Sequence, residues 1–232
     1  MEAIVLAGGL GTRLRARVAD RPKPMAEVAG KPFLARLLDY LESQGFTRIV
    51  LSVGYRHEAI SGYFGARHGA LELRYSIEAE PLGTGGAIRH ALIGGSVEDP
   101  LWVLNGDTML RLDYGAMLAA HGRGSAVAMR MALRRIPDVA RYGTVRVDGD
   151  RVTGFAASGT AGPGVINSGV YLLSRALFDG YDLPTAFSFE RDFLPGAAAQ
   201  GRVAGFVTDA LFIDIGVPED YDRAQTLLAG VR

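Results

Sequence analysis

The chain of 232 residues carries 25 Lys and Arg against 25 Asp and Glu, and 48% of its residues are hydrophobic. This composition excludes global disorder, and the zero net charge gives no basic surplus that would indicate nucleic acid or an anionic membrane as a partner. The absence of cysteine excludes disulfides, thiolate catalysis and cysteine zinc sites. We find no signal peptide, and no apolar run approaches the length of about 18 residues that a membrane-spanning helix needs. We therefore expect one cytoplasmic domain over residues 1–232.

The first half alternates strands with helices. The expected strands are Ala3–Leu6, Ile49–Val53, Leu71–Ile77, Leu101–Leu104 and Ala126–Met131, and the expected helices are Phe33 to Leu41, His57–Phe64, Thr84–Leu92 and Tyr114–His121. This order predicts an α/β fold of three layers around a mostly parallel mixed sheet. Ligands of such sheets bind outside the carboxyl ends of the strands.

The second half has a different pattern. A hairpin is expected from Thr144–Val147 and Val152–Phe155 around an Asp-Gly-Asp turn. Further along the chain we expect strands at Val165–Leu173 and Leu211–Ile215, a helix over Thr185–Phe193 that ends at Pro195, and a final helix from Pro218 to about Leu228.

A glycine-rich turn follows the first strand. Gly8, Gly9 and Gly11 lead to Thr12 and Arg13, and Lys23 lies between two prolines. Glycines let backbone N–H groups approach a polyphosphate, while arginine and lysine supply positive charge. The spacing lacks the third glycine of the dinucleotide fingerprint and the Gly-Lys-Ser/Thr of the P-loop. The turn therefore predicts a nucleoside triphosphate site, and the paired cations disfavour the alternative of an ordinary strand–helix turn.

Two aspartates lie at the ends of apolar strands. Asp107 follows Leu101–Leu104, and Asp214 lies within the strand Leu211–Ile215. Carboxylates in such places need a cation or hydrogen-bond donors, and oxygen ligands of this type suit Mg²⁺. Each could instead cap a helix or turn. Because there are two beside a phosphate-binding turn, we favour a magnesium site.

Three further clusters combine small and polar residues. Glu80–Ala87 contains a second glycine-rich turn, which permits close approach of a base or ribose, and Tyr142–Thr144 and Asn167–Gly169 suit the hydroxyls of a sugar. Each of the three clusters could instead be an ordinary turn or the end of a hairpin strand without a ligand. The four histidines are scattered, and no Gly-x-Ser-x-Gly nucleophile motif occurs.

Taken in order, these motifs closely resemble those of the sugar-1-phosphate nucleotidyltransferases along nearly the whole chain. The stretches 30–34, 80–86 and 187–194 are most similar to the branch of D-glycero-α-D-manno-heptose 1-phosphate guanylyltransferases, which supply GDP-heptose for bacterial surface glycans. The resemblance implies a Rossmann-like fold, with a nucleotide-binding half over about 1–125 and a sugar-binding half over about 126–232.

The resemblance also implies a role for individual residues. Arg13, Lys23 and Asp107 would be catalytic, and Asp107 and Asp214 would bind Mg²⁺. The nucleotide-binding residues would be Leu6, Ala7, Gly8, Gly9, Gly11, Thr12, Glu80, Gly83, Thr84 and Asn105. The sugar-binding residues would be Gly143, Asn167 and Glu190.

The expected reaction is Mg²⁺-dependent transfer of a nucleoside monophosphate from a nucleoside triphosphate to a sugar 1-phosphate, with release of pyrophosphate. The resemblance implies that the nucleotide is GTP and that the sugar is the heptose. Close relatives use UTP with N-acetylmuramate 1-phosphate or dTTP with glucose 1-phosphate. A non-catalytic nucleotide-sugar sensor is the alternative from another class. The sequence indicates no oligomeric state.

One segment departs from the family pattern. Many relatives carry Gly-Phe-x-Glu-Lys-Gly after the hairpin, where Glu and Lys help to hold the sugar phosphate, whereas this chain has Ala157 and Ser158 in those places. Either another cation, such as Arg191 or Arg141, compensates, or the acceptor binds weakly or differently.

Overall fold

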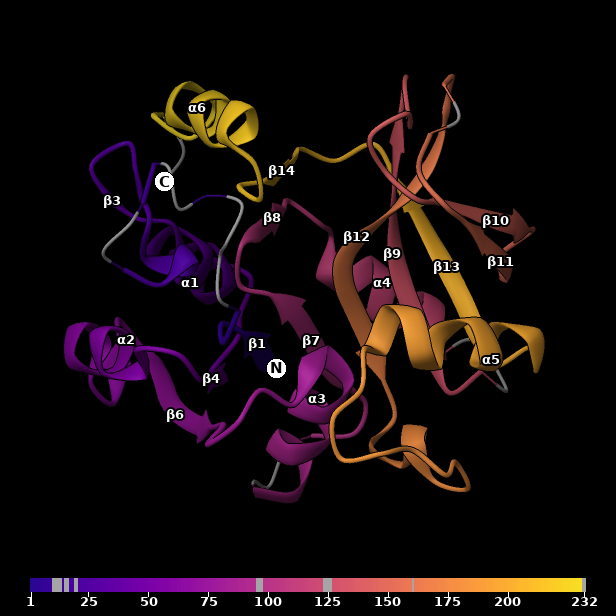
Figure 1. The fold of residues 1–232 in the computed structure, drawn as a ribbon, viewed down its shortest axis with the longest axis horizontal. Helices are drawn as coiled ribbons and strands as arrows, with labels where there is room; N and C mark the ends of the chain where they lie inside the picture. The colour runs from indigo at the N-terminus through magenta and orange to yellow at the C-terminus, as the bar shows by residue number, and fades with distance from the viewer. Residues whose placement is uncertain are drawn as a thin grey trace.

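The computed structural model describes residues 1–9, 14, 17–18, 21–94, 98–122, 127–159 and 161–230. Its main feature is a mixed sheet with the strand order β10-β11-β13-β9-β12-β7-β1-β4-β6-β5 (Figure 1). The strands of the sheet are β1 (Glu2–Leu6), β4 (Arg48–Val53), β5 (Arg67–His68), β6 (Leu71–Ile77), β7 (Leu101–Asn105), β9 (Met129–Ile136), β10 (Thr144–Asp148), β11 (Arg151–Ala156), β12 (Gly164–Leu173) and β13 (Val203–Thr208). Short strands outside it are β2 (Glu27–Val28), β3 (Lys31–Pro32), β8 (Thr108–Leu110) and β14 (Phe212–Asp214).

The first half is the parallel part of the sheet. Strand β1 pairs in parallel with β4 on one side and with β7 on the other, and β4 pairs in parallel with β6. The register sets Leu6 beside both Ser52 and Asn105. The carboxyl ends of these strands therefore meet at one edge, as the βαβ order predicts.

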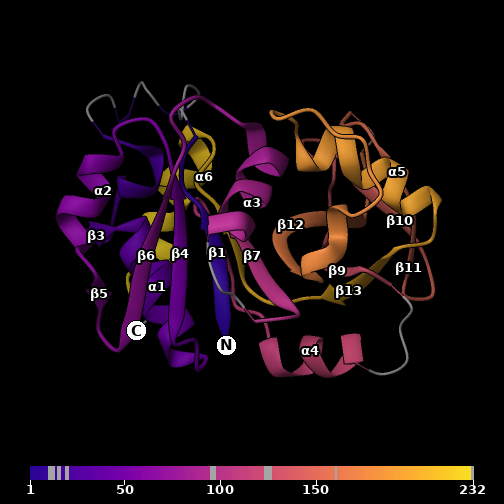
Figure 2. The same ribbon diagram turned by 90° about the horizontal axis from the view of Figure 1, so that it is seen from below.

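Helices cover both faces of this sheet. The helices of the described chain are α1 (Phe33–Ser43), α2 (His57–Phe64), α3 (Gly83–Gly94), α4 (Tyr114–Gly122), α5 (Leu194–Ala199) and α6 (Pro218–Leu227). Of these, α5 packs against β11 and β13 rather than against the parallel strands. Successive side chains of a strand point to opposite faces. Val5 of β1 shares a core with residues of α1, α4 and α6, whereas Ile4 shares a core with residues of α3 and α5 (Figure 2). The three-layer α/β prediction is confirmed for this half.

The second half is built mainly from antiparallel pairs, in line with the hairpin expected there. The sheet as a whole is therefore mixed, as predicted, but it is not mostly parallel. The hairpin β10–β11 pairs through β10 with β12 and through β11 with β13, and β9 lies between β12 and β13. These five strands close into a ring, and β12 joins the ring to β7 in an antiparallel pair. The physical reason is that a tight hairpin turn can join only antiparallel strands.

One predicted strand of the second half is shifted along the chain. The strand expected at Ala126–Met131 begins at Met129 and continues to Ile136, and Ala126 lies outside the described residues. The full length of this strand was missed because it contains arginines, which hydropathy assigns to the surface. Arg130 is nevertheless buried, and its guanidinium donates to the carbonyl oxygens of Gly205 and Ala120. The neighbouring strand β13, which pairs in parallel with β9, was not predicted.

The helix expected over Thr185–Phe193 is also corrected. A π-helical turn, η4 (Phe189–Phe193), begins after the capping residue Ser188 and leads directly into α5, which continues past Pro195. Proline in the first turn of a helix interrupts no hydrogen bond, so it does not end this helix. The residues before Ser188 are not helical: the chain bends at Thr185 and Ala186, and the Phe187 N–H donates to the carbonyl oxygen of Leu82. No helix in the described part of the chain is long and apolar enough to cross a membrane.

Candidate functional site

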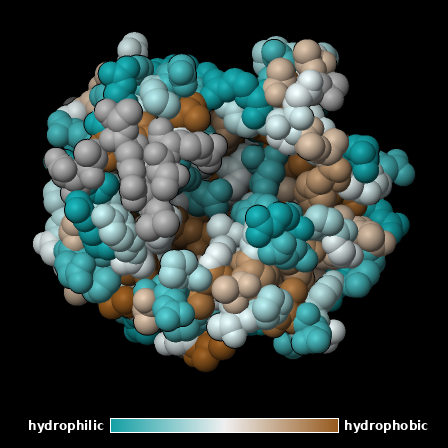
Figure 3. All heavy atoms as spheres, in the orientation of Figure 1, coloured by the Kyte–Doolittle hydropathy of each residue, from teal (hydrophilic) through white to brown (hydrophobic). Residues whose placement is uncertain are grey.

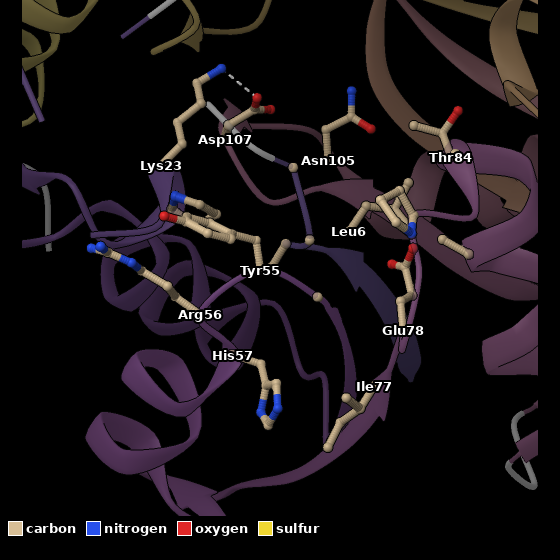
Figure 4. A pocket seen from close by; sticks show the side chains of 18 of the residues that line it. Leu6, Lys23, Tyr55, Arg56, His57, Ile77, Glu78, Thr84, Asn105 and Asp107 are labelled. Carbon is tan, nitrogen blue, oxygen red and sulfur yellow. Dashed lines mark hydrogen bonds and ion pairs between the residues drawn. The ribbon is translucent and has the colours of Figure 1, made fainter. Parts of the chain in front are cut away.

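A cavity of about 680 Å³ opens at the carboxyl edge of the parallel strands (Figure 4). The space-filling view shows the molecule hollowed between its two halves (Figure 3). The predicted site residues that line the cavity are Leu6, Ala7, Gly8, Gly9, Lys23, Gly83, Thr84, Asn105 and Asp107. Topology therefore brings together residues that the sequence nominates from four separate segments.

Lys23 lies between the two predicted magnesium aspartates. Its Nζ is 2.5 Å from Oδ2 of Asp107, the pair that is dashed in Figure 4. The same Nζ is 3.7 Å from Oδ1 of Asp214, and the Lys23 side chain is only 10% exposed. The lysine is held in a short 3₁₀ turn (Lys23–Met25), whose other residues, Pro24 and Met25, are buried. The ammonium group thus neutralises two carboxylates that would otherwise repel each other.

A small two-stranded sheet sets the two aspartates side by side. Strands β8 and β14 pair so that Asp214 lies opposite Thr108, and the Ile215 N–H donates to the backbone oxygen of Asp107 at 3.0 Å. Oδ1 of Asp214 also accepts from the Gly216 N–H at 2.7 Å, so this carboxylate does cap a turn, as the alternative interpretation held.

The donor set at this place suits a hard cation. Asp107 and Asp214 offer carboxylate oxygens, and Mg²⁺ is usually held by one or two carboxylates with phosphates and water completing its shell. Among the described residues no cluster of three or more His, Asp or Glu could hold a metal ion by itself. The residues therefore fit a magnesium ion that is shared with a phosphate-bearing ligand.

The first glycine turn approaches its neighbours closely. A Cβ at Gly8 would lie 2.9 Å from Oε1 of Glu78 and 3.2 Å from the backbone nitrogen of Gly54, so only glycine fits there without displacement. Gly9 has open space on that side, where a ligand can reach its backbone. The predicted residues Gly11, Thr12 and Arg13 lie outside the described residues.

The second glycine turn serves packing as well as the cavity. Gly83 has a φ of +69°, and Cβ atoms at Gly85 and Gly86 would lie 2.1 Å from the Phe187 ring and 2.5 Å from the Thr185 oxygen. These glycines therefore let residues 185–187, which precede η4, pack against the start of α3. Gly83 and Thr84 line the cavity, whereas Glu80 is exposed and does not.

A hydrogen-bonded network connects the cavity to β12. Oε2 of Glu190 accepts from the Thr84 hydroxyl at 2.6 Å, and Oε1 accepts from the Tyr171 hydroxyl at 3.3 Å. Asn167 Nδ2 donates to the same Tyr171 oxygen at 2.7 Å. Burial, and then the charge of Glu190, raise the pKa of Tyr171 well above its usual range, so its hydroxyl stays protonated. Two of the predicted sugar-binding residues, Asn167 and Glu190, are thus brought together.

Asn105 lies where the two halves meet. A Cβ at Gly169 of β12 would be 2.5 Å from Nδ2 of Asn105, so the backbone of β12 closely approaches this side chain. The Oδ1 atom of Asn105 is buried and finds no donor among the described residues. It can therefore accept a hydrogen bond from a ligand in the cavity. Gly143, the third predicted sugar-binding residue, precedes β10 and does not line the cavity.

Sequence reasoning missed several residues of the cavity wall. Glu78 follows β6 directly and accepts hydrogen bonds from the Ser52 hydroxyl and the Leu82 N–H, both at 3.1 Å. Its place directly after a strand of the parallel sheet is a signal that could have found it. Tyr55, Arg56 and His57 line the opposite wall (Figure 4). The signal that could have found them is their position directly after β4, which ends at the same sheet edge.

Comparison with known proteins shows the family to which the chain belongs. The family model described as "Nucleotidyl transferase" matches residues 2–230. The chain is 45% identical to a D-glycero-alpha-D-manno-heptose 1-phosphate guanylyltransferase of Aneurinibacillus thermoaerophilus, covering 97% of each chain. It is 42% identical to the protein of the same name from Campylobacter jejuni, covering 95% of this chain and 97% of that one. The crystal structure of HddC from Yersinia pseudotuberculosis complexed with GMP-PN is similar with a TM-score of 0.86 and 40% identity, covering 98% of this chain and 99% of that one.

Proposed function

Because the chain belongs to the nucleotidyl transferase family, we propose that it transfers a guanylyl group from GTP to D-glycero-α-D-manno-heptose 1-phosphate and releases pyrophosphate. The observation that carries the proposal is Lys23 between Asp107 and Asp214, beside the first glycine turn and at the carboxyl edge of the sheet. The choice of base and sugar is supported by the two relatives of that name, which match over nearly their whole length.

The chemistry needs charge neutralisation rather than a general base. An oxygen of the acceptor's phosphate attacks the α-phosphorus of GTP, and the bond from that phosphorus to the bridging oxygen of the β-phosphate breaks. The electron pair leaves with pyrophosphate. A phosphate monoester has a second pKa of about 6, so the attacking phosphate group is already largely a dianion at neutral pH. The barrier comes mainly from bringing two anions together in line.

Lys23 is suited to this task. Its ammonium group can turn from the aspartates toward the α-phosphate and stabilise the charge that develops there. Asp107 and Asp214 would hold Mg²⁺, which when bound would neutralise phosphate charge. Arg13 is proposed to stabilise the departing pyrophosphate. The backbone of Gly8 and Gly9 would face the triphosphate, and Gly83, Thr84 and Asn105 would contact the nucleoside.

The test is pyrophosphate release in the presence of Mg²⁺. GTP, UTP, dTTP, ATP and CTP are crossed against the 1-phosphates of heptose, mannose, glucose and N-acetylmuramate. Release that is strongest with GTP and the heptose phosphate supports the proposal. Release with another pair, such as UTP and N-acetylmuramate 1-phosphate, keeps the reaction and changes the substrates. Nucleotide binding without release for any pair would favour the sensor alternative.

A further inference from the structure

We infer that Lys23 keeps a divalent cation away from Asp107 and Asp214 until a nucleotide draws its ammonium group aside, so that the nucleotide must bind before the metal ion or together with it. The inference rests on the proposed function and concerns the order in which the ligands of that site bind. The ammonium group already lies against carboxylate oxygens that a divalent cation would need.

The ammonium group of Lys23 is closely surrounded. Its Nζ is 2.5 Å from Oδ2 of Asp107 and 3.7 Å from Oδ1 of Asp214. A Cβ at Gly216 would lie 3.2 Å from this Nζ and 2.9 Å from Oδ1 of Asp214, so a side chain at this position would crowd both groups. Since only 10% of the Lys23 side chain is exposed, the carboxylates take the place of water around its charge.

Both carboxylates also accept from a second donor. Oδ1 of Asp107 accepts from the Thr108 hydroxyl at 3.2 Å, and Oδ1 of Asp214 accepts from the Gly216 N–H at 2.7 Å. With the ammonium group between them, the two negative charges of the aspartates are offset by one positive charge. The ammonium group therefore opposes a divalent cation in two ways, because it repels the cation and competes for the same oxygens.

The aspartates are held by backbone pairing, whereas the ammonium group is at the end of a flexible side chain. Strands β8 and β14 pair, and the Ile215 N–H donates to the backbone oxygen of Asp107. The backbone of Lys23 is also fixed, because its carbonyl oxygen accepts from the Ala26 N–H at 3.0 Å and a proline stands on either side of it. The four-carbon stem of the lysine is thus the part that can move.

The cavity can offer the ammonium group another anionic partner. Lys23 and Asp107 line it together with Gly8 and Gly9, and Figure 4 shows the first two side chains pointing toward each other at one side of the cavity. A triphosphate at the glycine turn would bring phosphate oxygens that the flexible lysine can follow. Because the aspartates would then be released, the nucleotide and the metal ion are expected to strengthen each other's binding.

The experiment measures the binding of Mn²⁺, as a substitute for Mg²⁺, to the nucleotide-free protein by calorimetry and by the electron paramagnetic resonance of the free ion. Lys23→Met removes the charge and keeps most of the side-chain volume, so it is expected to bind Mn²⁺ at least about tenfold more tightly than the unchanged protein. Lys23→Arg keeps the charge and should bind Mn²⁺ no more tightly than the unchanged protein. Lys31→Ala is the matched control, because Lys31 pairs with Asp39 outside the cavity, and it should change nothing.

The binding of metal-free GTP should change in the opposite direction. In the presence of EDTA, Lys23→Met should bind GTP about 10- to 100-fold more weakly, because the phosphates lose their ammonium partner. A loss of folded structure would weaken the binding of both ligands, whereas the inference predicts tighter metal binding and weaker nucleotide binding from one substitution. Adding Asp214→Asn to Lys23→Met should remove most of the gained Mn²⁺ affinity, since it removes one of the two carboxylates.

The inference and the proposed function fail in different experiments. Both binding measurements are made without a sugar phosphate and require no turnover. The inference is refuted if Mn²⁺ binds Lys23→Met no more tightly than the unchanged protein, or if Asp214→Asn leaves the gained affinity intact. A protein that releases no pyrophosphate with any acceptor refutes the proposed function instead. If melting temperatures show that Lys23→Met does not fold, Lys23→Gln carries the same test, because its amide can still donate to Asp107.

Discussion

The two halves of the molecule place their polar groups in different ways. In the first half, functional residues follow the ends of parallel strands: the glycine turn follows β1, Glu78 follows β6, and Asp107 comes shortly after β7. In the second half, they lie within elements. Asn167 is inside β12, where the register against β9 shifts, and Glu190 is inside a π-helical turn.

The two halves therefore position their functional side chains by different means. Parallel strands bring their carboxyl ends to one edge whatever the side chains are, so topology alone assembles the first set. The second set depends on individual hydrogen bonds, such as those from Thr84 and Tyr171 to Glu190. Changes in the first half should therefore affect the chemical step, and changes in the second half should affect how the two halves are held together.

The largest effect is expected from Lys23→Ala. Removing the charge that acts on the reacting phosphates should lower kcat by about a thousandfold. The free energy of unfolding should fall by about 1–3 kcal/mol, because the two carboxylates lose the ammonium group that lies between them but are themselves about one-third exposed. Lys31→Ala is the matched control, because Lys31 pairs with Asp39 outside the cavity. Near-normal turnover of Lys23→Ala would falsify the assignment of this lysine.

The next effect is on the metal requirement. Asp107→Asn should raise the Mg²⁺ concentration for half-maximal activity at least about tenfold, because a neutral amide is a weaker ligand for a hard cation. Asp214→Asn should act in the same direction. Asp209→Asn is the control, since Asp209 is exposed and pairs with Arg134. An unchanged Mg²⁺ titration in Asp107→Asn would remove this residue from the metal site.

The same contrast explains how far the sequence could predict the structure. In the first half, apolar runs bounded by turns indicated most of the strands, and motif residues such as Gly8 and Asp107 follow closely after strand ends. No local pattern could show that Lys23 lies between Asp107 and Asp214, because that depends on the pairing of β8 with β14. Even so, the family pattern named the three residues together.

In the second half, local patterns were misleading. Strand β9 contains arginines that are satisfied only by distant partners, such as the Gly205 oxygen for Arg130, so its length could not be read from hydropathy. Pro195 looked like the end of a helix but lies in the first turn of α5. The contacts of Glu190 with Thr84 and Tyr171 likewise join residues far apart in the sequence. Long-range packing decided each of these features.

The joint between the halves can be weakened without touching the reacting groups. Gly85→Ala places a methyl group against the Phe187 ring, 2.1 Å from its nearest atom, and should lower the free energy of unfolding by about 1–3 kcal/mol. Gly94→Ala, in the same helix, meets no atom within 4 Å and should be neutral or stabilising by up to about 1 kcal/mol. Denaturant unfolding monitored by circular dichroism compares the two. Equal destabilisation would show that the contact with Phe187 does not restrict position 85.

The smallest effect is expected at the network that connects β12 to the cavity. In Glu190→Gln one carboxylate oxygen is replaced by an NH₂ group, which donates hydrogen bonds. The glutamine can therefore no longer accept a strong hydrogen bond from both the Thr84 and the Tyr171 hydroxyl. Loss of one such bond corresponds to about 1 kcal/mol, or about a fivefold lower kcat/KM. Tyr171→Phe removes one donor and leaves the Thr84 contact, so it should lower kcat/KM by no more than Glu190→Gln does. If Glu190 instead bound the sugar directly, Glu190→Gln would raise KM for the sugar phosphate alone, whereas a residue that positions both halves should change KM for GTP as well.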